Sequence, residues 1–241
     1  MTAVLIDEIL KERELRIQDC DAVCVSKGPG SYTGLRVGVS SAKGLCFGAG
    51  LPLLAVGTPD ILVAQGLQSA DEQPPAPKGN TPGPDRTSYY DAIIPVIDAR
   101  RDEVYTAVYT QGIGADKQPA ASPDAALGYM RTSPVRALIV GQDKFDTQLD
   151  GRSILFIGDA ADKCRRLLAQ APAGDDGRPA AASAGTPADL SHCRFVQTQP
   201  RADAMAALAQ QAFDRGAFED VAYFEPFYLK DFVATTPKKL F

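Results

Sequence analysis

A glycine-rich turn between an apolar run and a helical pattern constrains the fold of this chain more than any other sequence feature. The apolar run over 22–25 predicts a short buried strand, and it leads into a Gly-Pro-Gly turn. A helix is predicted over 33–47 and a second strand over 53–56, after which Thr58 and Pro59 are typical of a helix start. Strand, helix, strand and helix at this spacing predict a parallel strand pair with crossover connections, and therefore an α/β fold.

The remaining chain predicts further elements of the same kind. Two runs of β-branched and aromatic residues joined by a short polar connection predict an antiparallel hairpin, and the aromatic-rich tail is expected to pack against the fold. The predicted elements are a helix over 4–15, the hairpin strands over 92–97 and 104–109, a strand over 153–157, helices over 160–169 and 201–215, and the tail over 223–229.

Two segments of low complexity divide the chain. Residues 69–87 contain five prolines and two glycines without apolar periodicity, and residues 171–190 are rich in Ala, Pro and Gly. A chain of 241 residues is long enough for one to two domains. We therefore expect a first α/β lobe over 1–68, a Pro-rich loop over 69–87, and a second α/β lobe over 88–241 with an insertion at 171–190.

The charge balance and the cysteines restrict which partners the chain can bind and in which cellular compartment it is expected. The chain has 25 basic and 30 acidic residues, whereas binding to phosphates needs clustered Lys and Arg, so the chain is a poor candidate for binding nucleic acid alone. Acidic residues stand near the N-terminus where a signal peptide would be basic and apolar, and the longest uncharged stretch, 44–59, is too short to span a membrane. We expect a cytoplasmic protein without membrane contact, whose five scattered cysteines are reduced.

The glycine-rich turn is a candidate anion site because backbone amides at a helix N-terminus can hold an anion. Ser31 and Thr33 are each able to cap the following helix. However, a dinucleotide-binding pattern would need Gly at position 33, and the Gly-Lys-Ser/Thr of a phosphate loop never occurs. A weak anion contact and a tight structural turn both remain open, and ATP on this chain is not expected. The residues concerned are Gly28, Gly30, Ser31, Thr33, Gly34 and Arg36.

The helix after this turn carries small residues four apart, at Gly34, Gly38 and Ala42. Each interior glycine costs a helix about 1 kcal/mol relative to alanine, so repeated glycines indicate the close approach of another backbone. That backbone could belong to the chain's own sheet or to another subunit, and the residues alone favour neither.

Residues suited to catalysis are few. His192 is the only histidine, which excludes a multi-histidine metal site, and it lies beside a low-complexity segment. Asp98, Asp102 and Glu103 are interpreted as turn residues and as partners of the neighbouring arginines at 100 and 101. Lys230, Lys238 and Lys239 form a basic C-terminal cluster, for which a solvated tail and an RNA phosphate contact are both possible.

Several segments together resemble one known family. Gly28-Pro-Gly-Ser-Tyr-Thr-Gly-Leu-Arg36 with the following Ala42-Lys-Gly-Leu45 is similar to the GPGSFTGLR…AKGL segment of the TsaB (YeaZ) family. The similarity continues through 52–58, through Asp98-Ala-Arg-Arg-Asp-Glu-Val-Tyr105 and Gly158-Asp-Ala160, and ends at Pro226-Phe-Tyr-Leu-Lys230. The resemblance implies an actin/sugar-kinase/Hsp70-like fold of two α/β lobes.

The resemblance also implies a function. TsaB proteins support the synthesis of tRNA N6-threonylcarbamoyladenosine as non-catalytic paralogues that pair with the transferase TsaD, and the ATPase TsaE joins the pair. A member of this kind would need no metal or cofactor of its own and would contact tRNA only through the complex. In the family the pairing surface is built from the first two helices of the first lobe. Carried over, the expected interface residues are Leu5, Ile9, Leu35, Gly38, Val39 and Ala42.

Two alternatives stay open beside this expectation. One is an enzyme, either a nucleotide-dependent transferase or a glycoprotease-like peptidase. The other is a homodimeric structural protein that uses the same helices on itself.

One feature departs from the family. Its members begin with a strand and a hairpin, whereas this chain begins directly in the first helix. We expect the opening strands of the first lobe to be missing, which would leave the strand over 22–25 at an exposed sheet edge.

Overall fold

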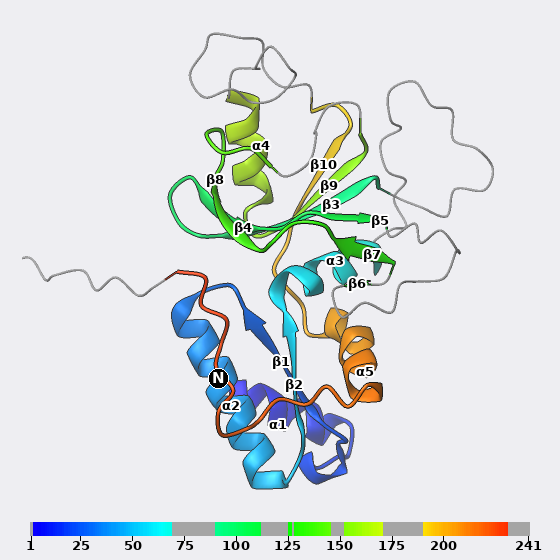
Figure 1. Ribbon diagram of the computed structural model, residues 1–241. Helices are drawn as coiled ribbons and strands as arrows, with labels where there is room; N and C mark the ends of the chain where they lie inside the picture. Colours follow the sequence, from blue (N-terminus) through cyan, green and yellow to red (C-terminus); the bar gives the residue numbers. More distant parts are fainter. Residues whose placement is uncertain are drawn as a thin grey trace, which may run out of the picture.

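The computed structural model describes residues 2–68, 90–111, 125–126, 128–145, 152–170 and 190–230. These residues form two sheets, one above the other, with helices against and between them (Figure 1). The predicted loop over 69–87, the insertion except for Leu190, and two of the three C-terminal lysines lie outside the described residues. Within the described part of the chain, no helix is both long and apolar enough to cross a membrane.

The first sheet contains two parallel strands, β1 (Val23–Gly28) and β2 (Leu53–Gly57), joined by the long helix α2 (Tyr32–Ala49). The helix α1 (Thr2–Glu12) and a short 3-10 turn, η1 (Ile17–Asp19), precede them. The predicted strand–turn–helix–strand order is therefore confirmed. Among the described strands β1 pairs only with β2, so its predicted position at a sheet edge is also confirmed.

The second sheet has eight strands and contains the predicted hairpin. Its main path runs β10-β9-β3-β5-β7-β6, with β4 paired to β3 and β8 paired to β4. The run predicted as one hairpin strand over 104–109 is divided into β4 and β5, which both pair with β3. The strands are β3 (Ala92–Asp98), β4 (Glu103–Thr106), β5 (Tyr109–Gln111), β6 (Ala125–Ala126), β7 (Tyr129–Arg131), β8 (Arg136–Ile139), β9 (Ile154–Gly158) and β10 (Cys193–Gln197).

Two helices cover the two faces of this second sheet. The helix α4 (Ala161–Gln170) buries Cys164 and Leu168 against one face. The helix α3 (Thr58–Gln68), which directly follows β2, packs on the other face and shares one apolar core with both sheets. Its Gly66 permits this close approach, because a Cβ there would lie 2.8 Å from Leu155 Cδ2. α3 thus connects the first sheet to the second (Figure 1).

The C-terminal segment returns to the first sheet. After η2 (Asp203–Met205), the helix α5 (Ala206–Asp214) packs beside β2, and the Glu219 amide donates a 2.8 Å hydrogen bond to the Leu53 carbonyl. The Lys43 ammonium on α2 then donates to the carbonyl oxygens of Ala222 and Phe224, at 3.0 and 3.1 Å. The predicted packing of the aromatic tail is confirmed. The sequence predicted this segment to belong to the second lobe, whereas α5 and Glu219 contact the first sheet and Lys230 reaches the second.

Candidate functional site

The glycine-rich turn has a structural explanation in its own geometry. β1 ends at Gly28, whose φ of +108° disfavours any residue with a side chain. A Cβ at Gly28 would also lie 2.8 Å from the carbonyl oxygen of Phe227 in the returning tail. Ser31 accepts a hydrogen bond from the Gly34 amide at 3.4 Å and is the N-cap of α2, as predicted. Close packing and capping therefore account for Gly28 and Ser31, and the anion contact stays a prediction.

The C-terminal tail packs against the first turn of α2. The rings of Tyr32 and Tyr228 lie with their centroids 5.0 Å apart, and the guanidinium of Arg36 lies 4.9 Å from the centroid of the Tyr32 ring. Of the other residues predicted for this turn, Thr33 and Gly34 are exposed, and a Cβ at Gly30 would meet no atom within 4 Å. The start of α2 is therefore held by aromatic packing on one side and open on the other.

The six residues expected at a partner interface divide into two groups. Leu5 and Ile9 on α1 are 52% and 59% exposed. The side chains of Leu35, Val39 and Ala42 are instead buried against the chain's own sheet. Gly38 is half-buried, and a Cβ there would contact Val25 of β1 at 4.0 Å. These four positions on α2 face β1 and β2, so their immediate role in this structure is intramolecular packing.

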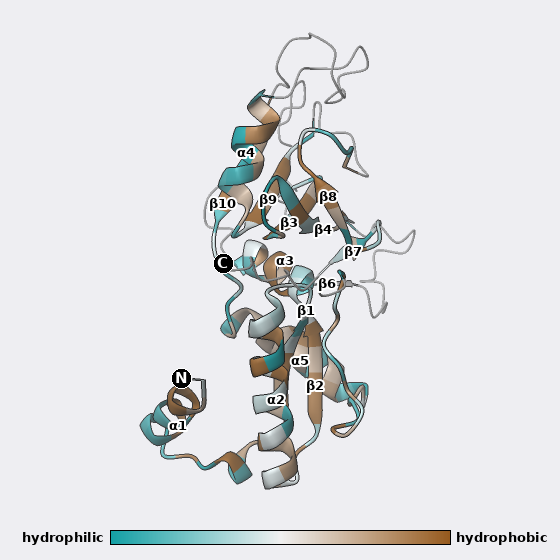
Figure 2. Cartoon of the chain, turned by 90° about the vertical axis from the view of Figure 1, so that its left-hand side faces the viewer, coloured by the Kyte–Doolittle hydropathy of each residue, from teal (hydrophilic) through white to brown (hydrophobic). Residues whose placement is uncertain are grey.

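The opposite face of α2 is the one that is open. Val37 is 51% exposed and Phe47 is 87% exposed, and a Cβ at Gly44 or Gly48 would meet nothing within 4 Å. α1 contacts α2, carries no buried residue, and exposes the side chains of Val4, Leu5 and Ile9. Figure 2 shows hydrophobic residues along the ribbon of α1. We call the exposed apolar and glycine positions of these two helices the α1–α2 surface. It comprises Val4, Leu5, Ile9, Val37, Gly44, Phe47 and Gly48.

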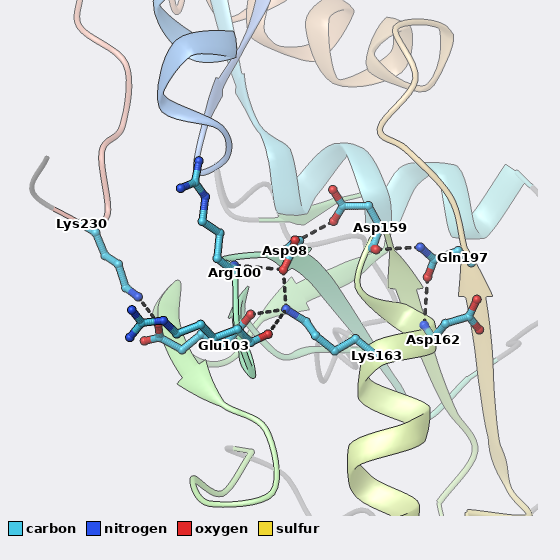
Figure 3. A network of polar contacts seen from close by, with 9 residues as sticks. Asp98, Arg100, Glu103, Asp159, Asp162, Lys163, Gln197 and Lys230 are labelled. Carbon is cyan, nitrogen blue, oxygen red and sulfur yellow. Dashed lines mark hydrogen bonds and ion pairs between the residues drawn. The ribbon is translucent and has the colours of Figure 1, made fainter. Parts of the chain in front are cut away.

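A second polar site surrounds the turn between β3 and β4 (Figure 3). Lys163 on α4 forms an ion pair with Asp98 and also donates to the carbonyl oxygens of Arg101 and Glu103, at 3.0 and 2.7 Å. The Glu103 carboxylate pairs with Lys230 of the tail. Within the described residues the ion-pair partners of Asp98 and Glu103 are lysines from distant elements, whereas the sequence predicted the neighbouring arginines as partners. Arg100 contributes its backbone amide, which donates to Asp98 at 3.0 Å, and its positive charge, which also favours the ionised form of Asp98.

The pKa values of Asp98 and Asp159 are shifted in opposite directions. Partial burial opposes ionisation of Asp98, but the hydrogen bond from Lys163 and that from the Arg100 amide outweigh it and hold the pKa of Asp98 below its ordinary value. Burial raises the pKa of Asp159, although the Asp98 amide donates to its carboxylate at 2.8 Å. Gln197 of β10 completes the network, since it donates to the Asp159 carbonyl at 2.7 Å and accepts from the Asp162 amide at 2.9 Å (Figure 3). The network joins β3, α4 and β10.

Burial affects two cysteines and the one histidine of the chain. Burial raises the pKa of the Cys24 thiol to about 11 and that of the Cys164 thiol to about 12, so both stay protonated at neutral pH. His192 is only 1% exposed. Within the described ranges, no group of three or more His, Cys, Asp and Glu side chains could hold a metal ion. The described cysteines are free thiols, in agreement with the sequence prediction.

Known structures share this architecture. The chain superposes on YeaZ from Pseudomonas aeruginosa with a TM-score of 0.63 at 19% identity, covering 93% of this chain and 80% of the other. A second structure from the same organism, described as an uncharacterized protein with similarity to peptidase YEAZ, gives 0.64 at 19% identity, covering 93% and 81%. The fold is therefore the actin/sugar-kinase/Hsp70-like α/β fold.

Sequence relatives narrow the assignment within that class. The family model described as TsaD, tRNA N6-adenosine threonylcarbamoyltransferase, matches residues 2–77. TsaB of Bacillus subtilis is 33% identical over 105 residues, and TsaB of Haemophilus influenzae is 38% identical over 101 residues. These matches cover 43% and 42% of this chain, but only 37% and 35% of the relatives, so the chain spans little more than a third of their length. Over the matched residues the chain is therefore similar to TsaB (YeaZ) proteins, in agreement with the motifs that carry the resemblance.

Proposed function

We propose that this chain is a non-catalytic accessory subunit in the synthesis of tRNA N6-threonylcarbamoyladenosine and that it binds a TsaD-type transferase. The observation that carries the proposal is the α1–α2 surface, where Val4, Leu5, Ile9 and Val37 are each more than half exposed and Phe47 is 87% exposed. Exposed groups of large apolar side chains often mark protein–protein contacts. The names of the curated relatives support the same process.

The glycines of α2 refine the kind of contact that we propose. Gly44 and Gly48 lie one turn apart on the exposed side of the helix, beside the exposed ring of Phe47. Small residues at this spacing let a second helix approach closely, while the aromatic ring provides apolar area at the contact. The partner surface is then a helix of TsaD that packs along α2. TsaE and tRNA belong to the same proposal as components reached through the TsaD complex.

Co-elution with a TsaD protein in size-exclusion chromatography tests this proposal. Wild-type chain should co-elute with TsaD, whereas Phe47→Glu places a charge in the apolar contact and should abolish co-elution. Ala169→Glu is the matched control, because it adds the same charge to an exposed position of α4 in the second lobe. Equal binding by wild type and Phe47→Glu would contradict the proposed surface.

The chemistry of the described residues favours this role over an enzyme. The Cys24 and Cys164 thiols are kept protonated by burial, and Lys163 is committed to Asp98 and to two backbone carbonyls. Peptide cleavage or nucleotide hydrolysis by the isolated chain would contradict the accessory role. A homodimer through the same helices is the other outcome, and light scattering of the chain alone and with TsaD distinguishes the two.

A further inference from the structure

A cavity of about 220 Å³ lies away from the α1–α2 surface, where the first sheet, α5 and β7 meet. Its charged lining residues come from four elements: Lys27 of β1, Asp60 of α3, Arg131 of β7, and Arg215 directly after α5. Three cations and one carboxylate give the lining a formal charge of +2. Because the elements come from distant parts of the chain, this charge is concentrated by the fold and is not a property of any local sequence.

Three donor side chains of the lining have no polar partner within the described ranges. These are the half-buried Lys27 and Gln211 and the exposed Arg215. Lys27 is a half-buried residue whose ammonium has no ion-pair partner among the described residues, so this charge is available to an anion. The carboxylate of Asp60 is the obvious internal candidate for that role.

Asp60 is held in place by other contacts. The Tyr109 hydroxyl donates a 2.6 Å hydrogen bond to Asp60 Oδ1, and burial keeps this hydroxyl protonated because it raises the pKa of Tyr109. Asp60 Oδ2 lies so close to Gly57 that a Cβ there would collide with it. The Asp60 carboxylate is therefore fixed between Tyr109 and the backbone of Gly57, and the donors at Lys27 and Arg215 remain available to a ligand.

We propose that this cavity binds a small doubly charged anion of the phosphate type, either free phosphate or the phosphate group of a small monoester. A guanidinium and an ammonium are the groups that proteins use most to bind phosphate oxygens, and the Gln211 amide adds a neutral donor. A volume of about 220 Å³ suits a phosphate with a few carbon atoms. It is smaller than the roughly 300–1,000 Å³ of sites for drug-sized ligands, so a whole nucleotide would not be enclosed. This site goes beyond the proposed pairing with TsaD and does not depend on it.

Titration of the full chain with inorganic phosphate at constant ionic strength tests the site. Thermal unfolding and ³¹P line broadening should both show saturable binding with a Kd of about 1 mM or lower. Glycerol 3-phosphate is the second ligand: tighter binding than phosphate would identify a monoester site, and equal or weaker binding would identify a site for the free ion. Either result supports the cavity, whereas no saturable binding of either ligand at 20 mM would overturn it.

The residue test uses variants that remove charge from the cavity or elsewhere. Lys27→Gln with Arg215→Gln should weaken phosphate binding at least tenfold, and Arg215→Gln alone, at an exposed position, should weaken it several-fold without affecting folding. Lys11→Gln with Arg165→Gln is the control, since it removes the same charge from exposed positions on α1 and α4. Phosphate binding that is unchanged in the Arg215→Gln variant, or equally weakened in the control, would overturn the assignment.

Discussion

The backbone amide of Phe227 donates a 2.7 Å hydrogen bond to the carbonyl oxygen of Lys27, which joins the C-terminal tail to the end of β1. This contact is placed directly before Gly28, where the chain adopts its positive φ and leaves no room for a side chain. The glycine-rich turn, the start of α2 and the tail therefore form one packed unit. In this structure the unit holds the C-terminal tail against β1 and α2.

That arrangement predicts a large difference between two glycines of the turn. Gly28→Ala should lower the free energy of unfolding by about 2 kcal/mol, because the Cβ would strain the backbone and collide with the Phe227 carbonyl. Gly30→Ala is the control, since a Cβ there meets no atom within 4 Å. Urea denaturation measures both, and equal stability of the two variants would contradict the packing described here.

Substitutions at Gly44 distinguish effects on the stability of the chain from effects on its binding to TsaD. The substitution adds a methyl group into open space in the middle of α2 and should stabilise the isolated chain by roughly 0.5–1 kcal/mol through helix propensity. Gly44→Leu should likewise leave the chain folded but weaken binding to TsaD, because the larger side chain would hold the partner helix away. The midpoint of thermal unfolding and the Kd for TsaD are the measurements. A Gly44→Leu chain that is folded and binds as tightly as wild type would show that this face is not the interface.

The Asp98–Lys163 ion pair predicts a specific pH dependence of stability. The pKa of Asp98 is lowered in the folded chain, so its contribution is present above the unfolded value of about 3.9 and is lost as pH falls through the folded pKa. Because Asp98 is half exposed, Asp98→Asn should cost only about 0.5–1 kcal/mol at pH 7 and less at pH 3. Unfolding free energies at the two pH values check this, and a cost that is equal at both would exclude the ion pair as the cause.

For Asp159 we expect the opposite pH dependence of stability from that of Asp98. Burial raises its pKa, so the ionised form destabilises the fold once pH rises above the unfolded value of about 3.9. Asp159→Asn keeps an oxygen that can accept from the Asp98 amide but removes the charge. Relative to wild type, this variant should therefore become more stable as pH is raised from 3 to 7. A relative loss of stability over that range would contradict the raised pKa.

The sequence predicted the elements that depend on local patterns. The strand, turn, helix and strand over 22–57 were expected because apolar periodicity, a Gly-Pro-Gly turn and a serine cap are all local signals. The division of the run over 104–109 into β4 and β5 was not predicted, since it depends on which parts of that run pair with β3. The return of α5 to the first sheet could not be predicted either, because only long-range contacts determine it.

The interface predicted from the sequence stays a prediction, but the structure buries three of its α2 residues against the chain's own sheet. Leu35, Val39 and Ala42 recur at the helical spacing of a buried stripe, and this same periodicity indicates the side of α2 that packs on a sheet. Val37 and Phe47 lie out of phase with that stripe, which is the signal that could have identified them. The lysine partners of Asp98 and Glu103 had no such signal, because Lys163 and Lys230 are distant in sequence and only the fold brings them together.

The most direct test of the α1–α2 surface is the Kd between this chain and a TsaD protein, determined for wild type, Phe47→Glu and Ala169→Glu by light scattering and calorimetry. We expect a one-to-one complex for wild type and for Ala169→Glu, and at least tenfold weaker binding for Phe47→Glu. No complex with TsaD, or a complex that Phe47→Glu leaves unchanged, would contradict this expectation.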